Sequence, residues 1–154
     1  RMRQRLTDTI TSWRFFLPTT NKCNIITSFP IISRIMKDKL ASEYFSRKHM
    51  LSCSQAVAKA FQNELNLTDA FIADLNKDSS GMAPGGLCGS VYAALELSKG
   101  EKMKHEVIEG FLKESKYPTC RDIRLNRTIS CRKTVELAAS LLEEQLLVDV
   151  SKSA

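Results

Sequence analysis

The chain has 154 residues, 43% of them hydrophobic and 26% charged, which is typical of one globular domain with a core of its own. Its formal net charge of +6 comes almost entirely from residues 1–35, which carry six basic residues and one acidic residue. Residues 36–154 are nearly neutral and no apolar stretch could span a bilayer, so we expect neither a nucleic-acid partner nor a membrane span.

The first 35 residues show no sustained helical or strand period. Pro30 and Arg34 interrupt their most apolar stretch, and Cys23 lies within them. The tetrapeptide that begins at Met36 resembles an ordinary protein start. We therefore expect residues 1–35 to be a poorly structured basic extension upstream of the natural initiation site, and residues 36–150 to form a single helical domain.

From Met36 onward the apolar residues recur at helical intervals. A short first helix is expected where Met36, Leu40 and Tyr44 recur every four residues. Ser52 and Gln55 have the spacing of a capping box, which predicts that a second helix begins there. Thr68 is expected to cap a shorter helix.

The second half of the body is organised around a glycine-rich loop. Residues 76–86 contain aspartate, serine, proline and three glycines, and they are predicted as this loop. Helices are expected at about 88–98, 102–116 and 130–148, with a short turn from Pro118 to Ile123 between the last two. Strand patterns are weak throughout. The predicted fold is therefore all-α, a compact bundle of about five to six helices with a glycine-rich loop before a central helix.

Four cysteines, Cys53, Cys88, Cys120 and Cys131, each follow a residue pair that is typical of a helix start. The first turn of a helix exposes unpaired N–H groups and carries the positive end of the macrodipole, so a thiol there is expected to have a lowered pKa. Thiolate is the form of cysteine that attacks disulfides and binds metals. This pattern predicts sulfur chemistry.

The residues next to the cysteines in the sequence also favour sulfur chemistry. Around Cys88, three glycines are expected to let the backbone approach a bound group closely and to favour a negative charge: Gly85, Gly86 and Gly89. Arg121 and Arg132 directly follow Cys120 and Cys131 and are expected to lower their thiol pKa further. His49 lies one turn before Cys53 as a conceivable base or ligand, although a lone histidine at a helix end is more often merely solvated.

No Cys-x-x-Cys pair occurs, so a thioredoxin-type dithiol, a zinc ribbon and a ferredoxin-type cluster lack their usual motifs. The sequence also lacks a phosphate-binding loop, because the glycine-rich segment has no following Lys-Ser or Lys-Thr. The four cysteines must therefore converge in three dimensions if they act together.

Four sequence segments resemble the redox-active family named C_GCAxxG_C_C, whose name describes four widely separated cysteines. These segments are Ser-Cys53-Ser-Gln-Ala-Val, Gly81-Met-Ala-Pro-Gly-Gly-Leu-Cys88-Gly-Ser-Val-Tyr-Ala-Ala, Cys120-Arg-Asp and Cys131-x3-Val-x2-Ala-Ala-x2-Leu-Glu-Glu. The chain departs from the family pattern at Ser90, where the family has alanine, and at Ala93, where it has glycine. The resemblance spans residues 38–147 and implies a helical, cytoplasmic redox protein that works beside an oxidoreductase or a transporter-linked partner.

We therefore expect Cys53, Cys88, Cys120 and Cys131 to form one redox centre. The leading hypothesis is that their thiolates bind an iron–sulfur cluster, with Gly85, Gly86 and Gly89 beside it, for electron transfer to a partner, and the resemblance implies a cluster of the [2Fe–2S] type. One alternative is a cofactor-free thiol–disulfide protein in which Cys88 attacks and another cysteine resolves the mixed disulfide. An alternative of another class is a structural zinc site in an interaction module. Enzymatic activity and homodimer formation stay open.

Overall fold

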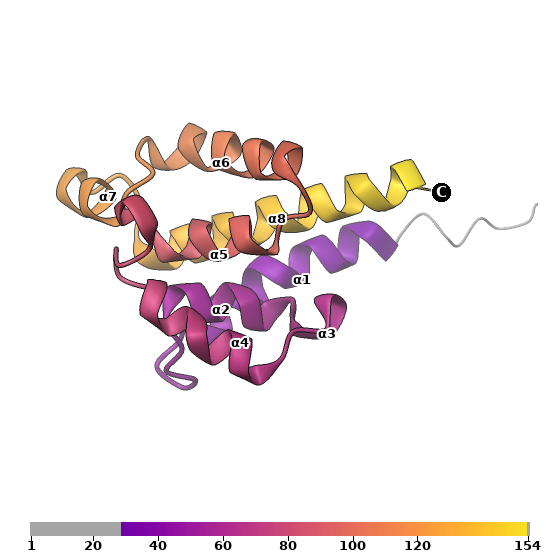
Figure 1. Ribbon diagram of the computed structural model, residues 1–154, viewed down its shortest axis with the longest axis horizontal. Coiled ribbons are helices and arrows are strands. Elements are labelled where there is room, and N and C mark those ends of the chain that lie inside the picture. Colours follow the sequence, from indigo (N-terminus) through magenta and orange to yellow (C-terminus); the bar gives the residue numbers. More distant parts are fainter. Residues whose placement is uncertain (1–28, 154) are drawn as a thin grey trace, which may run out of the picture.

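The computed structural model describes residues 29–153, and these form an all-α fold (Figure 1), as predicted. No strand occurs within this range, although one isolated antiparallel bridge joins Leu87 and Thr119. The described part of the chain contains eight α-helices, more than the five to six expected: α1 (Phe29–Tyr44), α2 (Cys53–Ala60), α3 (Gln62–Leu65), α4 (Asp69–Asp74), α5 (Gly89–Leu97), α6 (Glu101–Ser115), α7 (Cys120–Asn126) and α8 (Cys131–Ser153).

The long helix α8 runs the length of the molecule and packs against α1, α2, α5 and α6. Helix α1 lies alongside it, and α5 is in contact with both α2 and α6. Helices α2, α5 and α8 all begin at the end of the molecule where α7 lies, on the left in Figure 1. Their N-terminal ends are therefore gathered in one region.

Small residues let these helices approach closely. Ala93 and Ala94 of α5 and Ala138 and Ala139 of α8 are fully buried. Larger side chains fill the remaining space, and the largest fully buried ones are Phe61, Phe111 and Leu142. On α8, Val135, Ala138, Ala139 and Leu142 have no exposed surface and Leu146 is half-buried, so this face of the helix packs into the core.

The predicted helix starts are marked by hydrogen bonds. The Ser52 N–H donates to Gln55 Oε1 at 3.1 Å, one arm of the expected capping box. The Thr68 hydroxyl accepts from the Phe71 N–H at 3.2 Å, as predicted for an N-cap. Thr119 caps α7 by accepting from the Asp122 N–H at 3.1 Å. The segment predicted as a short turn is therefore a helix of two turns, α7.

Helix α1 begins at Phe29 rather than Met36, so the boundary predicted after residue 35 falls inside a helix. The physical reason is the position of Pro30, which lies in the first turn, where its missing N–H costs no helical hydrogen bond. Residues 1–28, with Cys23, lie outside the described part of the chain. At the other end, α8 extends to Ser153, beyond the predicted end at Val148.

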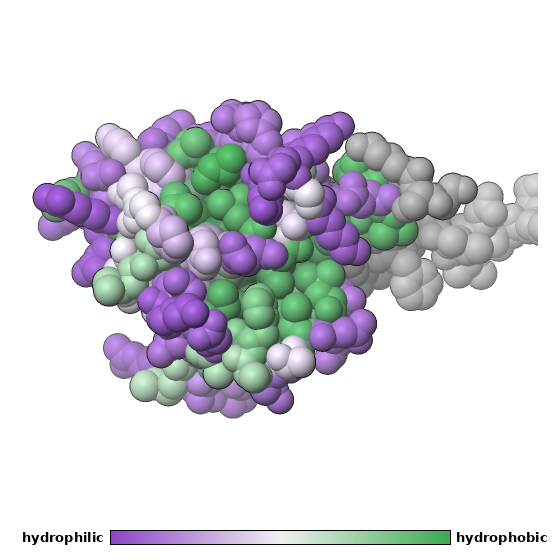
Figure 2. Space-filling model, viewed as in Figure 1, coloured by the Kyte–Doolittle hydropathy of each residue, from purple (hydrophilic) through white to green (hydrophobic). Residues whose placement is uncertain are grey.

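Hydrophilic residues cover most of the surface in Figure 2. Hydrophobic residues reach this surface between α5 and α6, where Leu95, Ile108 and Leu112 line a groove. Within the described residues, no helix has both the length and the apolar character needed to cross a membrane.

Candidate cysteine centre

All four cysteines of the body lie at helix N-termini, as predicted. Cys53, Cys120 and Cys131 are the first residues of α2, α7 and α8, and Cys88 is the N-cap of α5. Because these helix ends are gathered at one end of the bundle, the four thiols come from four separate elements to the same region.

The four cysteines line a single cavity of about 120 Å³. No disulfide joins them in the structure. Phe45 and Ser80 from two other segments complete the wall, together with three residues from the same helix starts as the cysteines: Ser52, Arg124 and Thr134. The structure thus brings together residues that are dispersed over half of the chain.

A backbone contact between two loops places Cys88 beside Cys120. Leu87 and Thr119 form the isolated antiparallel bridge, and the Cys88 N–H donates to the Pro118 carbonyl at 2.9 Å. Each cysteine is the residue directly after one member of the bridge, so the loop before α5 and the loop before α7 hold the two thiols side by side.

Two glycines permit the close packing around these sulfur atoms. A Cβ atom at Gly89 would lie 2.9 Å from Cys53 Sγ and 2.8 Å from the Asp78 carbonyl oxygen, closer than real Cβ contacts. A Cβ atom at Gly81 would lie 3.1 Å from Cys120 Cβ, and the φ of Gly81 is +86°, where a side chain is strained. The expected role of Gly89 in close approach therefore has a geometric basis, and Gly81 has a similar role that the sequence analysis did not identify.

Gly85 and Gly86 have a different role from the one expected. Neither lines the cysteine cavity, and a Cβ atom at either would meet nothing within 4 Å. Both have positive φ values, +68° and +72°, so they are required by the conformation of the loop rather than by approach to the thiols. They line a neighbouring open cleft instead.

The four cysteines differ in how much of their surface is exposed to solvent. Cys88 is buried, with 5% of its surface exposed, Cys53 and Cys120 are half-buried, and Cys131 is exposed. The cavity is therefore closed around Cys88 and reachable from solvent at Cys131.

The thiol pKa values of Cys53 and Cys120 are raised, not lowered as the helix-start argument predicted. Burial is the main cause in both cases, because it penalises the charged thiolate. Proximity to Cys88 raises both values further, and the backbone hydrogen bonds from Ser80 and Ser54 only partly oppose this at Cys53. Desolvation and mutual repulsion thus outweigh the favourable helix ends.

The arginines also differ from expectation. Arg124 is the arginine that hydrogen-bonds Cys120 and opposes the rise in its pKa, whereas the adjacent Arg121 is not among the main contributors. Residues four apart share one face of a helix, while adjacent residues do not, which explains the difference. Arg132 Nη1 donates to the hydroxyl of Ser42 at 2.8 Å and so ties α8 to α1 rather than serving Cys131.

Ser90 contributes a contact that the sequence analysis did not anticipate. Its hydroxyl is fully buried and lies 3.2 Å from Cys88 Sγ. Ser90 is one of the two positions where the chain departs from the C_GCAxxG_C_C pattern, and this departure places a polar group against the most buried thiol.

The histidines lie elsewhere. His49 Nε2 is 3.8 Å from Glu43 Oε1, its ring meets that of Tyr44 edge-on, and it does not line the cysteine cavity. His105 is exposed on α6. Among residues 37–151, no group of three or more His, Cys, Asp or Glu side chains is arranged to hold a metal ion.

The chemistry of the donor set nevertheless suits a metal cofactor with sulfur ligands. Four thiols around one cavity provide the soft sulfur ligands and the number of cysteines that an iron–sulfur cluster uses. Comparisons of the chain with family models, curated proteins and solved structures give no match.

Proposed function

We propose that the four-cysteine cavity is a redox centre. The observation that carries this proposal is that Cys53, Cys88, Cys120 and Cys131, from four separate helices, line one cavity of about 120 Å³. Packing alone does not require sulfur at four helix starts, and the glycines at positions 81 and 89 keep the backbone close to two of these cysteines.

The leading form of the proposal is that the four thiolates bind an iron–sulfur cluster, as the resemblance to the C_GCAxxG_C_C family implies. When bound, such a cluster would accept and release single electrons. The chain would supply four sulfur ligands, helix N-termini whose partial positive charge offsets negative charge, and apolar shielding around Cys88.

The raised pKa values support a ligand role over a nucleophilic one. At neutral pH the Cys53 and Cys120 thiols stay protonated more than ordinary thiols, which makes them slow nucleophiles. A positively charged metal reverses this effect, because a coordinating thiol loses its proton. Several thiols close together with one neighbouring arginine are better suited to share metal ions than to persist as free thiolates.

Cofactor-free thiol–disulfide exchange is the second candidate, and the exposure of Cys131 favours it. Two of the thiols would lose two electrons and two protons to a disulfide-bearing partner, which would be reduced to two thiols. Cys88 is too buried to make the first attack expected of it, so that step would fall to the exposed Cys131.

The proposal includes a partner oxidoreductase that exchanges electrons with the centre and a cytoplasmic location, where thiols stay reduced. It does not require a second copy of the chain, because one chain supplies all four sulfur atoms.

Anaerobic purification of the full chain tests the proposal. The expected result is brown protein that contains iron and acid-labile sulfide, and Cys88→Ser should remove the colour. Cys23→Ser is the matched control, since it changes the one cysteine outside the set of four, and it should keep the colour.

Colourless protein that resists reconstitution with iron and sulfide, but forms a reversible disulfide under mild oxidant, would overturn the cluster in favour of thiol exchange. Stoichiometric zinc with inert thiols would overturn the redox proposal and favour a structural site. If each of the four single Cys→Ser variants kept the iron content and the disulfide formation of the wild type, the cysteines would not act together.

A further inference from the structure

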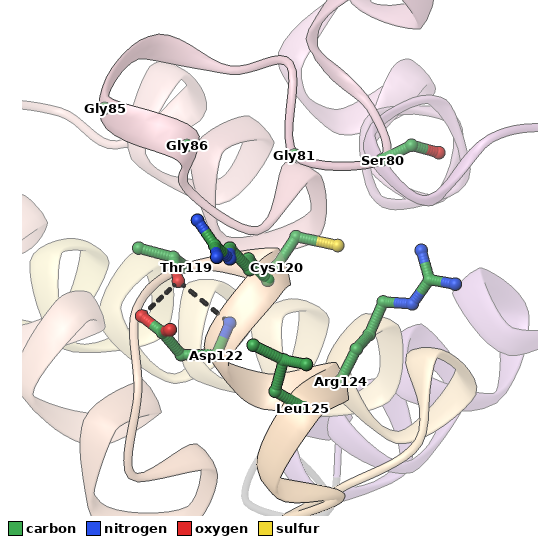
Figure 3. Close-up of a pocket in the computed structure, with 10 residues that line it drawn as sticks. Ser80, Gly81, Gly85, Gly86, Thr119, Cys120, Asp122, Arg124 and Leu125 are labelled. Carbon is green, nitrogen blue, oxygen red and sulfur yellow. Dashed lines mark hydrogen bonds between the residues drawn. The ribbon is translucent and has the colours of Figure 1, made fainter.

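An open cleft of about 760 Å³ adjoins the cysteine cavity (Figure 3). One wall is the glycine-rich loop with Ser80, Gly81, Gly85 and Gly86, and the other is the start of α7 from Thr119 to Leu125. Its volume lies within the range of small-molecule sites in proteins.

The cleft and the cysteine cavity share three residues: Ser80, Cys120 and Arg124. Figure 3 shows the Cys120 sulfur and the Arg124 guanidinium directed to the same side of α7, beneath Ser80. A molecule in the cleft can therefore reach Cys120 without entering the smaller cavity.

Two arginines give the cleft its charge. Arg121 and Arg124 both line it and are exposed, and no carboxylate in the described part of the chain forms an ion pair with either. The cleft also contains Asp122, but its carboxylate accepts the Thr119 hydroxyl at 2.6 Å. Arg121 thus keeps its donors available for a ligand, and Arg124 keeps those that its hydrogen bond to the Cys120 thiol does not use.

The opposite wall presents backbone rather than side chains. Gly85 and Gly86 hold positive φ values that side chains rarely adopt, and the space beside their α-carbons is open. Because no side chain projects from these two glycines, the full width of the cleft is open to a ligand. The two arginines line the cleft from α7.

We propose that this cleft binds a small molecule bearing a carboxylate or phosphate group, which Arg121 and Arg124 hold against Cys120. The planar guanidinium fork matches both oxyanions with paired hydrogen bonds. The inference rests on the proposed function only in placing this molecule beside the redox centre, because the arginine-lined cleft exists whether or not a cofactor binds.

Two alkylating reagents of almost the same size test the proposal on the reduced, metal-free full chain. Iodoacetate is an anion and iodoacetamide is neutral, and both react with the same Cys120 thiolate. The ratio of their rates at Cys120, measured by peptide mass spectrometry, therefore cancels any change in the thiol pKa.

The expected result is that the double variant Arg121→Gln/Arg124→Gln lowers the iodoacetate-to-iodoacetamide ratio at Cys120 about three- to tenfold at low salt. Arg127→Gln is the matched control, since Arg127 directly follows α7 but does not line the cleft, and it should leave the ratio unchanged. An unchanged ratio in the double variant, with native circular dichroism, would overturn the proposal.

Competition identifies the oxyanion. Inorganic phosphate or citrate should slow the reaction of iodoacetamide at Cys120 in the wild type but not in the double variant, and the more effective anion indicates the class of ligand. Equal slowing in both proteins would contradict binding by these arginines.

Iron and sulfide content, measured on the same proteins, separates the two proposals. A double variant that loads the centre normally while its ratio is unchanged would overturn this inference alone. A lowered ratio in a chain that never binds iron would support the cleft and overturn the cluster.

Discussion

Cys120 shows how position on a helix, rather than adjacency in sequence, decides which charge acts on a thiol. Burial raises its pKa, the neighbouring Cys88 and Cys131 raise it further, and Arg124 opposes them from one turn along α7. The analysis of the sequence selected Arg121 because it is the next residue. Applying the four-residue spacing of a helix to the predicted turn would have selected Arg124 instead.

This difference predicts that substitutions of the two arginines have different effects on the pKa of Cys120. Arg124→Gln removes a positive charge that stabilises the thiolate, so the pKa of Cys120 should rise further above its ordinary range. Arg121→Gln should leave it unchanged. The measurement is the pH dependence of iodoacetamide alkylation at Cys120 in reduced, metal-free protein, where the midpoint should move to higher pH only in the first variant.

A midpoint that moves with Arg121→Gln and not with Arg124→Gln would restore the interpretation from adjacency. A midpoint below the ordinary range of a cysteine in the wild type would contradict the dominant effect of burial.

At the scale of elements, the contact between the start of α5 and the start of α2 determines how closely Cys88 and Cys53 approach each other. Gly89 is the first residue of α5, and only its lack of a side chain leaves room for Cys53 Sγ and the Asp78 carbonyl. The carbonyl belongs to the backbone, so it cannot turn aside as a flexible side chain can.

Gly89→Ala should therefore separate α5 from α2 and destabilise the fold by about 1–3 kcal/mol, the usual cost of overpacking. Urea unfolding measures this cost. Gly110→Ala on α6 is the control, because the added methyl would meet only the end of the Leu141 side chain and would gain helix propensity. Equal stability of the two variants would show that the contact at Gly89 is not tight.

Element boundaries also show what the sequence could and could not predict. The helices at 89–97, 101–115 and 131–153 follow from strong apolar periods, and their observed starts lie within one residue of the predicted ones. The predicted start of α1 is too late because Pro30 interrupts the apolar stretch in the sequence, whereas proline in a first turn is compatible with a helix. Helix α7 differs from the predicted turn because its seven residues are too few to establish a period.

For the whole molecule, the helix-start pattern identified the four cysteines of the cavity, but not their order of exposure or their charge balance. Which thiol is buried depends on packing across the bundle, as with Cys88 beneath the bridge between Leu87 and Thr119. Likewise, nothing local marks Ser80 or Phe45 as a wall of the cavity, because they reach it from distant segments.

A ligand shared by α2, α5, α7 and α8 should stabilise the entire bundle, because it binds only the folded arrangement. At a hundredfold excess over its dissociation constant, such a ligand contributes about 2.7 kcal/mol, or a rise in Tm of roughly 10 °C. Calorimetry of the full chain before and after anaerobic reconstitution with iron and sulfide measures this rise, and Cys53→Ser should abolish it. No change in Tm on loading would indicate that iron binds outside the cavity.

The dispersal of the four cysteines along the chain has a consequence for biosynthesis. Cys53 and Cys131 are about half the chain apart, and α8 leaves the ribosome after the other three helices of the cavity. The cavity cannot exist in a nascent chain that lacks α8, nor in one whose loops before α5 and α7 have not yet paired. Contacts between residues so distant in sequence form late in folding, because the loop between them must close first. A ligand that needs all four thiols would therefore bind only chains that have completed folding.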